Sequence, residues 1–230
     1  MSSPQFILCE AAAPASDATM GYAAGAREIL EAHGGEIIVA APADAAQPLE
    51  VGTEKHALVA LKFSAEGAAK AFWADPAHRE LFSSLESTPG FLHAISITGI
   101  PEEGLPGEPL PTTATVTIPD NPAPSGWMLV QGTISDPGPI ARYMEILVPM
   151  IVERGGVYRV WTDPDGPELL AGDWPRQYVV FSEYPSIEVA NELWYSDTYQ
   201  NEAILARKPA SDFRVLLFEA NAAARVQKSD

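Results

Sequence analysis

The chain contains an internal repeat, because residues 20–73 recur without a gap about 121 positions later, at 141–194. The matched positions hold the same or similar residues, mostly aromatic side chains and turn glycines. They pair Tyr22 with Tyr143, Gly34-Gly35 with Gly155-Gly156, Lys55 with Arg176, Phe63 with Tyr184, and Trp73 with Trp194. Self-similarity at a fixed offset constrains the architecture more than any single motif does. It predicts one α+β unit that occurs twice, with the two copies packed on each other.

Both copies show the same order of predicted elements. An apolar run of strand length (5–10 and 127–134) precedes a helix whose apolar residues recur at spacings of three and four. Each helix is expected to end at Gly-Gly, where glycine tolerates the left-handed conformation of a C-cap. Two strands, a second helix and a last strand follow in each copy. The order β-α-β-β-α-β is typical of the ferredoxin-like arrangement.

The composition divides the chain into four segments. They are a first repeat (1–98), a linker (99–126), a second repeat (127–220) and a tail (221–230). Seven prolines in the linker exclude a regular helix and predict a semi-extended strap. Asp136, Ser64 and Ser186 are the expected N-caps of three helices, because their side-chain oxygens can accept from free backbone N–H groups.

The second copy carries several spaced motifs. These are Gly155-Gly156, the Gly-Asp-Trp-Pro-Arg segment at 172–176, the strand and turn at 179–186, and the Leu-Trp-Tyr-Ser-Asp-Thr-Tyr segment at 193–199. With these motifs, residues 127–219 resemble the DUF1330 family of the dimeric α+β barrel superfamily. The first copy looks like a degraded relative that lacks the Trp-Pro and Trp-Tyr-Ser pairs. The resemblance implies an α+β fold in which two ferredoxin-like repeats form an intramolecular dimeric α+β barrel.

The superfamily also implies a range of functions. Its members include cofactor-free monooxygenases, polyketide cyclases, chlorite dismutase-like and haem-degrading enzymes, and lactone isomerases. We therefore expect a cofactor-independent enzyme that performs isomerase, cyclase or lyase chemistry on a small aromatic or carbonyl-containing metabolite. Two alternatives stay open: a non-catalytic ligand-binding or assembly module, and a haem- or flavin-dependent oxidoreductase.

The charge of the chain argues against several partners. Acidic residues outnumber basic ones by 31 to 14, and the net charge of −17 repels nucleic acid and anionic lipid headgroups. No apolar stretch approaches the roughly 20 residues of a membrane span, and the N-terminus lacks a signal-peptide pattern. The single cysteine, Cys9, excludes an internal disulfide. These features predict a cytoplasmic protein, monomer or homodimer, whose partner is a small-molecule ligand.

Four residues are candidates for catalysis. Alternation along the strands suggests that Arg159 and Glu183 face a common space. Arg159 suits an oxyanion and Glu183 suits a general base, although the two could equally form a structural ion pair. The hydroxyl of Tyr143 is either a proton donor or a lock between helix and sheet. His56 opens a strand of the first copy and is its best candidate base.

Five further residues are candidates for substrate binding. They are Trp161, Arg176, Gln131, Trp127 and Tyr195. The aromatic members would line a flat, apolar site if they do not simply pack in the core. No metal or cofactor is expected, since the histidines form no zinc-type pattern and no phosphate-binding loop is present.

Two other residues carry weaker expectations. Cys9 is aligned with Gln131 and is expected to be a buried small hydrophobe. His93 is the residue that the superfamily resemblance offers as a haem ligand.

Overall fold

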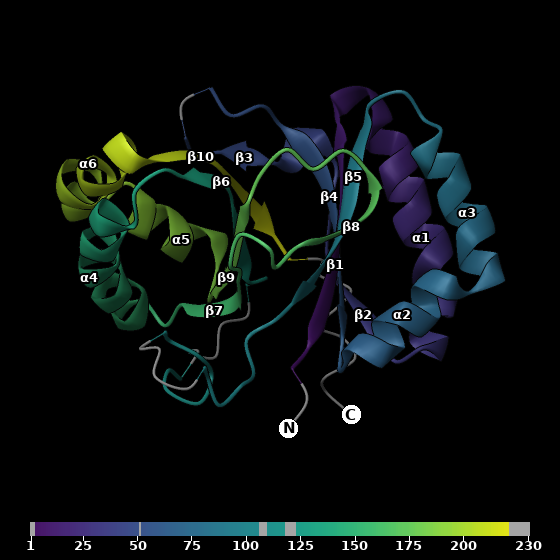
Figure 1. Cartoon of the computed structure of the whole chain (residues 1–230), viewed down its shortest axis with the longest axis horizontal. Helices are drawn as coiled ribbons and strands as arrows, with labels where there is room; N and C mark the ends of the chain where they lie inside the picture. Colours follow the sequence, from purple (N-terminus) through teal and green to yellow (C-terminus); the bar gives the residue numbers. More distant parts are fainter. Residues whose placement is uncertain (1–2, 51, 106–109, 118–122, 221–230) are drawn as a thin grey trace.

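Two β-sheets face each other in the middle of the protein, and the helices cover their outer sides (Figure 1). The computed structural model describes residues 3–50, 52–105, 110–117 and 123–220. The expected tail (221–230) and parts of the linker lie outside these residues. The repeat predicted two packed α+β units and the family resemblance predicted an α+β barrel, and both expectations are confirmed.

The first repeat supplies the elements drawn from purple to teal in Figure 1. In chain order these are β1 (Gln5–Ala12), a 3₁₀ turn (Ala13–Ala15), α1 (Ser16–Ala32), β2 (Gly35–Ala41), a 3₁₀ turn (Ala43–Ala45), β3 (Gln47–Pro48), β4 (His56–Phe63), α2 (Glu66–Ala74), α3 (Pro76–Glu86) and β5 (Phe91–Thr98).

The second repeat runs through the same order. Its elements are β6 (Gly126–Ile134), α4 (Pro137–Glu153), β7 (Val157–Trp161), β8 (Glu168–Gly172), β9 (Tyr178–Tyr184), α5 (Ile187–Trp194), a π-helical turn (Tyr199–Ala203), α6 (Ile204–Arg207), a 3₁₀ turn (Lys208–Ala210) and β10 (Ser211–Glu219).

The two repeats exchange edge strands. The sheet orders are β2-β4-β1-β5-β8 and β3-β10-β6-β9-β7, and every pairing is antiparallel. The first four strands of the first sheet and the last four of the second have the ferredoxin-like order. The fifth strand of each sheet comes from the other repeat: β8 pairs with β5, and β3 pairs with β10. Each repeat therefore covers an edge that the other would leave unpaired.

Local sequence signals explain most helix ends. Gly34 and Gly155 follow α1 and α4 with φ values of 69° and 67°, so both helices stop at the predicted glycine pairs. Asp136 caps α4 by accepting from the N–H of Gly138, and Ser186 caps α5 by accepting from that of Val189. The N-cap of α2 is Ala65, one residue beyond the expected Ser64.

Apolar side chains fill most of the space between the sheets. This central core draws on both repeats and includes Phe6 and Leu58 from the first, and Leu129, Phe181 and Phe218 from the second. Two further cores lie between each sheet and its own helices. The inter-sheet space is therefore a packed interior over most of its length rather than an open chamber.

The linker covers a free sheet edge. Its described residues before Gly126, where β6 begins, form no helix or strand. The N–H of Ile100 donates to the carbonyl of Arg159, and the N–H of Tyr158 donates to that of Pro111. Both contacts lie along β7, the edge strand of the second sheet. Within the described part of the chain, no helix has both the length and the apolar character needed to cross a membrane.

Candidate functional site

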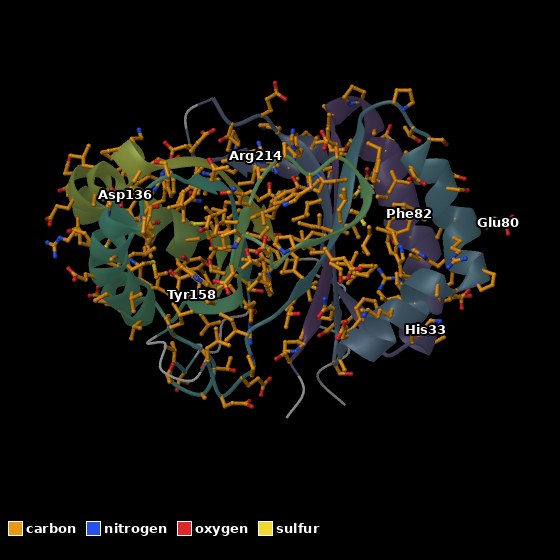
Figure 2. All side chains as sticks on the ribbon, viewed as in Figure 1. His33, Glu80, Phe82, Asp136, Tyr158 and Arg214 are labelled. Carbon is orange, nitrogen blue, oxygen red and sulfur yellow. The ribbon has the colours of Figure 1, made fainter. Side chains whose placement is uncertain are left out.

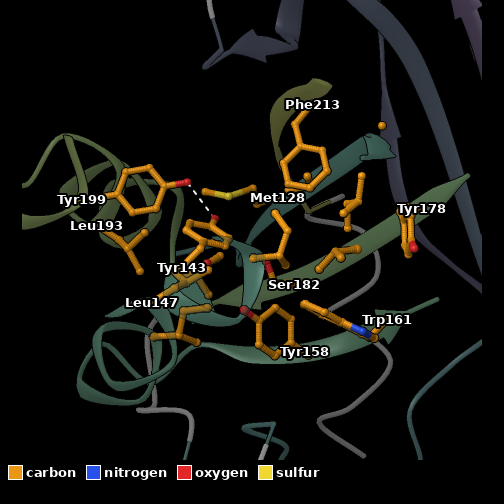
Figure 3. A pocket seen from close by; sticks show the side chains of 17 residues that line it. Met128, Tyr143, Leu147, Tyr158, Trp161, Tyr178, Ser182, Leu193, Tyr199 and Phe213 are labelled. Atoms are coloured by element: carbon orange, nitrogen blue, oxygen red, sulfur yellow. Dashed lines mark hydrogen bonds between the residues drawn. The ribbon is translucent and has the colours of Figure 1, made fainter. Parts of the chain in front are cut away.

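An aromatic cavity of about 50 Å³ lies between the second sheet and its helices. Its walls come from the outer face of β6, β7, β9 and β10 and from α4, α5 and the π-helical turn (Figure 3). The lining residues are almost all apolar or aromatic. They are Met128, Val130, Gly132, Ile134, Ile140, Tyr143, Leu147, Ile151, Tyr158, Trp161, Tyr178, Val180, Ser182, Tyr184, Leu193, Tyr199 and Phe213. Such a lining suits a flat, largely uncharged molecule.

Tyrosine hydroxyls supply most of the polar atoms of the aromatic cavity. The hydroxyls of Tyr143 and Tyr199 share a hydrogen bond of 3.1 Å. The hydroxyl of Tyr158, directly across the strand pair from Ser182, is buried and has no hydrogen-bond partner among the described residues. Figure 3 shows the hydroxyl of Tyr143 joined to that of Tyr199 by a dashed line, with the Tyr158 and Ser182 side chains among the same lining residues. A buried hydroxyl without a partner is costly, so a ligand oxygen would relieve it.

Burial keeps these tyrosines protonated. It raises the pKa of Tyr158 and of Tyr199 well above the usual value for a phenol. Burial also raises the pKa of Tyr143, although the positive charge of Arg207 opposes the effect. The guanidinium carbon of Arg207 lies 5.7 Å from the centre of the Tyr143 ring, and its charge is balanced by an ion pair with Glu50. The hydroxyls are therefore hydrogen-bond donors at neutral pH.

The matching space of the first repeat is lined by different side chains. Tyr22 matches Tyr143, and its hydroxyl lies 2.9 Å from Nε2 of His78, which matches Tyr199. The ring of Phe82 packs 5.7 Å from that of Tyr22 beneath α3 (Figure 2). On the strands, Leu61 takes the place of Ser182 and Ile37 that of Tyr158. All residues that line the aromatic cavity belong to the second repeat.

A cluster of charged and polar side chains is buried between the two sheets, and we call it the central cluster. It consists of Glu10, His56 and His93 from the first repeat and Gln131 and Arg214 from the second. The Glu10 carboxylate is fully buried. It lies 3.1 Å from Nε2 of His93 and 3.4 Å from Nδ1 of His56, and it accepts hydrogen bonds from Arg214 and Gln131. Figure 2 shows Arg214 between the two sheets.

The central cluster holds Glu10 in its ionised form. Burial alone would raise the pKa of Glu10, but the positive charge of Arg214 and hydrogen bonds from both histidines hold it well below its usual value. The two repeats contribute matched residues, since Glu10 corresponds to Gln131 and His93 to Arg214 at the same offset. The sequence alignment that paired Cys9 with Gln131 is therefore wrong by one residue, and Glu10 was missed. Cys9 itself is buried on the helix side of β1, as expected.

The structure separates the residues predicted from the sequence. Tyr143 and Trp161 line the aromatic cavity, whereas His56 and Gln131 belong to the central cluster. Arg176 lies beside that cluster, across a polar cleft. The four residues proposed for catalysis therefore do not share one site.

The other four predicted residues lie elsewhere. The guanidinium of Arg159 donates two hydrogen bonds, of 2.9 and 2.7 Å, to one oxygen of Glu183, so each is the other's partner. Trp127 packs on Phe181 in the central core, and its indole N–H donates to Ser125. Tyr195 is 61% exposed after the end of α5.

A haem fits neither site. Haem needs an axial ligand beside a space that accepts a porphyrin, and the aromatic cavity encloses only about 50 Å³. The Nε2 atom of His93 faces Glu10 inside the packed interior, and its ring contacts Trp174 at 4.9 Å. Among the described residues, no group of His, Cys, Asp and Glu has the arrangement of a metal site.

Both repeats match one protein family. The family model DUF1330, a domain of unknown function, covers residues 5–89 and 125–221. The match includes the first copy, although that copy lacks several motifs of the second. Among curated proteins, none matches this sequence.

Several solved structures have a similar fold at low sequence identity. A proposed monooxygenase from Fusobacterium nucleatum subsp. nucleatum gives a TM-score of 0.56 at 9% identity, over 95% of this chain and 93% of that one. A dye-decolorizing protein from V. cholerae gives 0.52 at 10% identity, over 99% and 96%. An anthrone oxidase-like protein gives 0.50 at 10% identity, over 96% and 92%. At these identities the similarity establishes the fold alone.

Proposed function

Because the chain belongs to the DUF1330 family, whose name assigns no activity, we propose a function from the geometry of the aromatic cavity. The protein is a cofactor-independent enzyme that acts on a small aromatic or other carbonyl compound. The reaction is an enolisation, the step shared by many isomerases, cyclases and lyases. With its single cysteine buried and unpaired, the protein suits the reducing cytoplasm.

The unpartnered hydroxyl of Tyr158 carries this proposal. It is an O–H donor free to bind a ligand oxygen, and the linked hydroxyls of Tyr143 and Tyr199 line the same largely apolar cavity. Donors aimed at a carbonyl oxygen stabilise the negative charge that develops there during enolisation. An aromatic carbonyl substrate also agrees with the name of the anthrone oxidase-like protein, whose likeness is one of fold.

The cavity lining narrows the substrate class. The lining contains no Asp, Glu, His or Lys. Glu183, the base predicted from the sequence, lies between Ser182 and Tyr184 on β9, so its side chain points to the other face of the sheet. The substrate must therefore have a C–H that is already acidic, as between two carbonyl groups. That C–H bond breaks, its electron pair forms the C=C bond of the enolate, the carbonyl oxygen takes the negative charge, and the proton goes to water. The half-buried Trp161 and Tyr178 mark the side of the cavity nearest to solvent.

A non-catalytic binding module is the second candidate. The absence of a general base from the cavity lining favours it, since a pure binding site needs donors and apolar walls but no base.

The size of the cavity bears on both candidates. A cavity of about 50 Å³ is smaller than the ~150 Å³ that accepts benzene in an engineered protein core, so a ring must displace side chains as it enters.

Deuterium exchange at the central carbon of acetylacetone or benzoylacetone, followed by NMR, tests the proposal. We expect the protein to accelerate exchange, and Tyr158→Phe to slow it by about 10²- to 10³-fold, the usual effect of losing one oxyanion donor. Ser182→Leu, which copies Leu61 of the first repeat, should abolish binding by filling the cavity. Tyr22→Phe is the control, because it removes a buried tyrosine hydroxyl from the first repeat, outside the lining of the aromatic cavity.

The two candidates give different results. Binding of benzoylacetone without accelerated exchange would support the binding module and refute the enzyme. Equal rates for Tyr158→Phe and Tyr22→Phe would show that the Tyr158 hydroxyl has no part in the reaction.

A further inference from the structure

A polar cleft of about 280 Å³ opens next to the central cluster, on the other side of the second sheet from the aromatic cavity. Three separate segments line it. They contribute Gly52, Thr53, Glu54 and His56 before and at the start of β4, Arg176 before β9, and Asp212, Phe213 and Arg214 in β10. Phe213 lines both spaces and lies between them. The cleft is therefore a feature of the junction between the two repeats.

The inner wall of the cleft is basic. Arg214 and His56 are each only 8% exposed. Arg176 is half-buried, and its guanidinium has no hydrogen bond or ion pair with any described residue. Burial and, to a smaller extent, the nearby charge of Arg214 lower the pKa of Arg176, while the charges of Glu10 and Asp212 act in the opposite direction. An arginine so placed lacks the anion that its five donors would bind.

The acidic residues of the cleft lie at its rim. The side chain of Glu54 is 85% exposed, with one carboxylate oxygen 3.8 Å from Nε2 of His56, and Asp212 is also exposed. Water screens these charges, so they weaken the attraction of the inner wall only slightly. The carboxylates of Glu54 and Asp212 do repel a multiply charged anion that approaches both of them.

The central cluster fixes the inner wall from behind. One nitrogen of the Arg214 guanidinium donates to Glu10 and Gln131, and another contacts Nδ1 of His56. Glu10 thus holds the side chains of Arg214 and His56 in place before a ligand arrives, which lowers the cost of binding. Arg176 has no such anchor and can turn its planar fork onto a ligand.

We propose that this cleft binds a small molecule through a carboxylate group, with Arg176 as the residue that recognises it and with His56 and Arg214 as a fixed wall. A planar, singly charged carboxylate matches the fork of a guanidinium and avoids the repulsion that the rim imposes on phosphate dianions. The site is separate from the aromatic cavity in position and in ligand chemistry, so it does not depend on the proposed enolisation.

Calorimetric titration with acetate, benzoate and inorganic phosphate at pH 7 and low chloride tests this site. We expect acetate and benzoate to bind and phosphate to bind more weakly. Arg176→Gln should weaken carboxylate binding by about ten- to a hundredfold, the loss typical of one charged hydrogen-bonded pair. Arg142→Gln is the control, because Arg142 is exposed and, among the residues that the structure describes, forms its ion pair with Glu145 on the same helix. It should leave the affinity unchanged.

A second measurement uses the wild-type protein, so its result does not depend on whether a variant folds. The Nε–H signal of Arg176 in an NMR spectrum of the wild-type protein should shift as acetate is added, while that of Arg142 should not. The proposal is overturned if no carboxylate binds, if phosphate binds as tightly as acetate, or if Arg176→Gln binds acetate like the wild type.

Discussion

Replacing Glu10 by glutamine isolates the charge at the centre of the protein. The change preserves the size and most hydrogen-bonding capacity of the side chain, but it leaves the guanidinium of Arg214 buried without a counter-charge. Breaking a buried ion pair by removing one partner typically costs about 3–5 kcal/mol. Because whole domains are stable by only about 5–15 kcal/mol, Glu10→Gln should lose a large part of the free energy of unfolding at pH 7.

Urea unfolding followed by tryptophan fluorescence measures this loss, since the chain contains five tryptophans. Glu36→Gln is the matched control on the same sheet. Glu36 pairs with Lys62 at 3.1 Å, but both side chains are partly exposed, and such a pair is worth about 1 kcal/mol or less. Equal midpoints for the two variants would refute the argument that Glu10 neutralises a buried charge.

The pH dependence provides an independent check. The pKa of Glu10 is lower in the folded protein than its unfolded value of about 4.3, so its contribution to stability is complete above that pH. The contribution disappears as the pH falls through the folded-state pKa. The gap between wild type and Glu10→Gln should therefore narrow below about pH 4.3. A gap that stays constant down to pH 2 would contradict the depressed pKa.

Two further predictions concern the backbone and a histidine. Gly172 has a φ of 77°, and an added Cβ would lie 2.2 Å from the carbonyl oxygen of Leu92, so Gly172→Ala should destabilise the protein by more than about 1 kcal/mol in urea unfolding. Gly21→Ala in α1 meets no atom within 4 Å and should stabilise it by up to about 1 kcal/mol; the same sign for both would contradict this reasoning. Burial lowers the pKa of His78 to about 4, so its contribution to stability is present above the unfolded pKa of about 6.5 and is lost as the pH falls toward 4. Between pH 7 and pH 5 the melting temperature of His78→Phe should therefore fall less than that of the wild type, and an equal fall would exclude His78 as the cause.

The repeat and its local signals were enough to predict two ferredoxin-like units that pack on each other. They include period-two strands, helices that stop at Gly34 and Gly155, and an N-cap at Asp136. The barrel itself was predicted from the resemblance to the DUF1330 family. The exchange of β3 and β8 was not predicted. Both strands are short and lie in polar connections, and their pairing depends on contacts with the other repeat that no local pattern records.

The sites were harder to predict than the fold. Alternation placed Glu183 and Arg159 on one face, but it could not show that they bind each other or that apolar side chains fill the interior. Tyr143 and Trp161 were found because aromatic residues mark cavities as well as cores. Glu10 was missed although one signal was available. A charged residue at the end of an apolar strand corresponds to Gln131 at an offset of 121, and a one-residue slip in the alignment hid the match.

The swapped edge strands have a consequence for evolution and engineering. A chain cut in the linker (99–126) would give two fragments. Each fragment carries one strand, β3 or β8, that belongs to the sheet of the other fragment. Neither fragment contains all five strands of its own sheet, because β8 of the second repeat completes the first sheet and β3 of the first repeat completes the second. Gene fusion would then have joined two units whose sheets already depended on each other for an edge strand. After fusion, one half could lose motifs as long as it still supplied its strand.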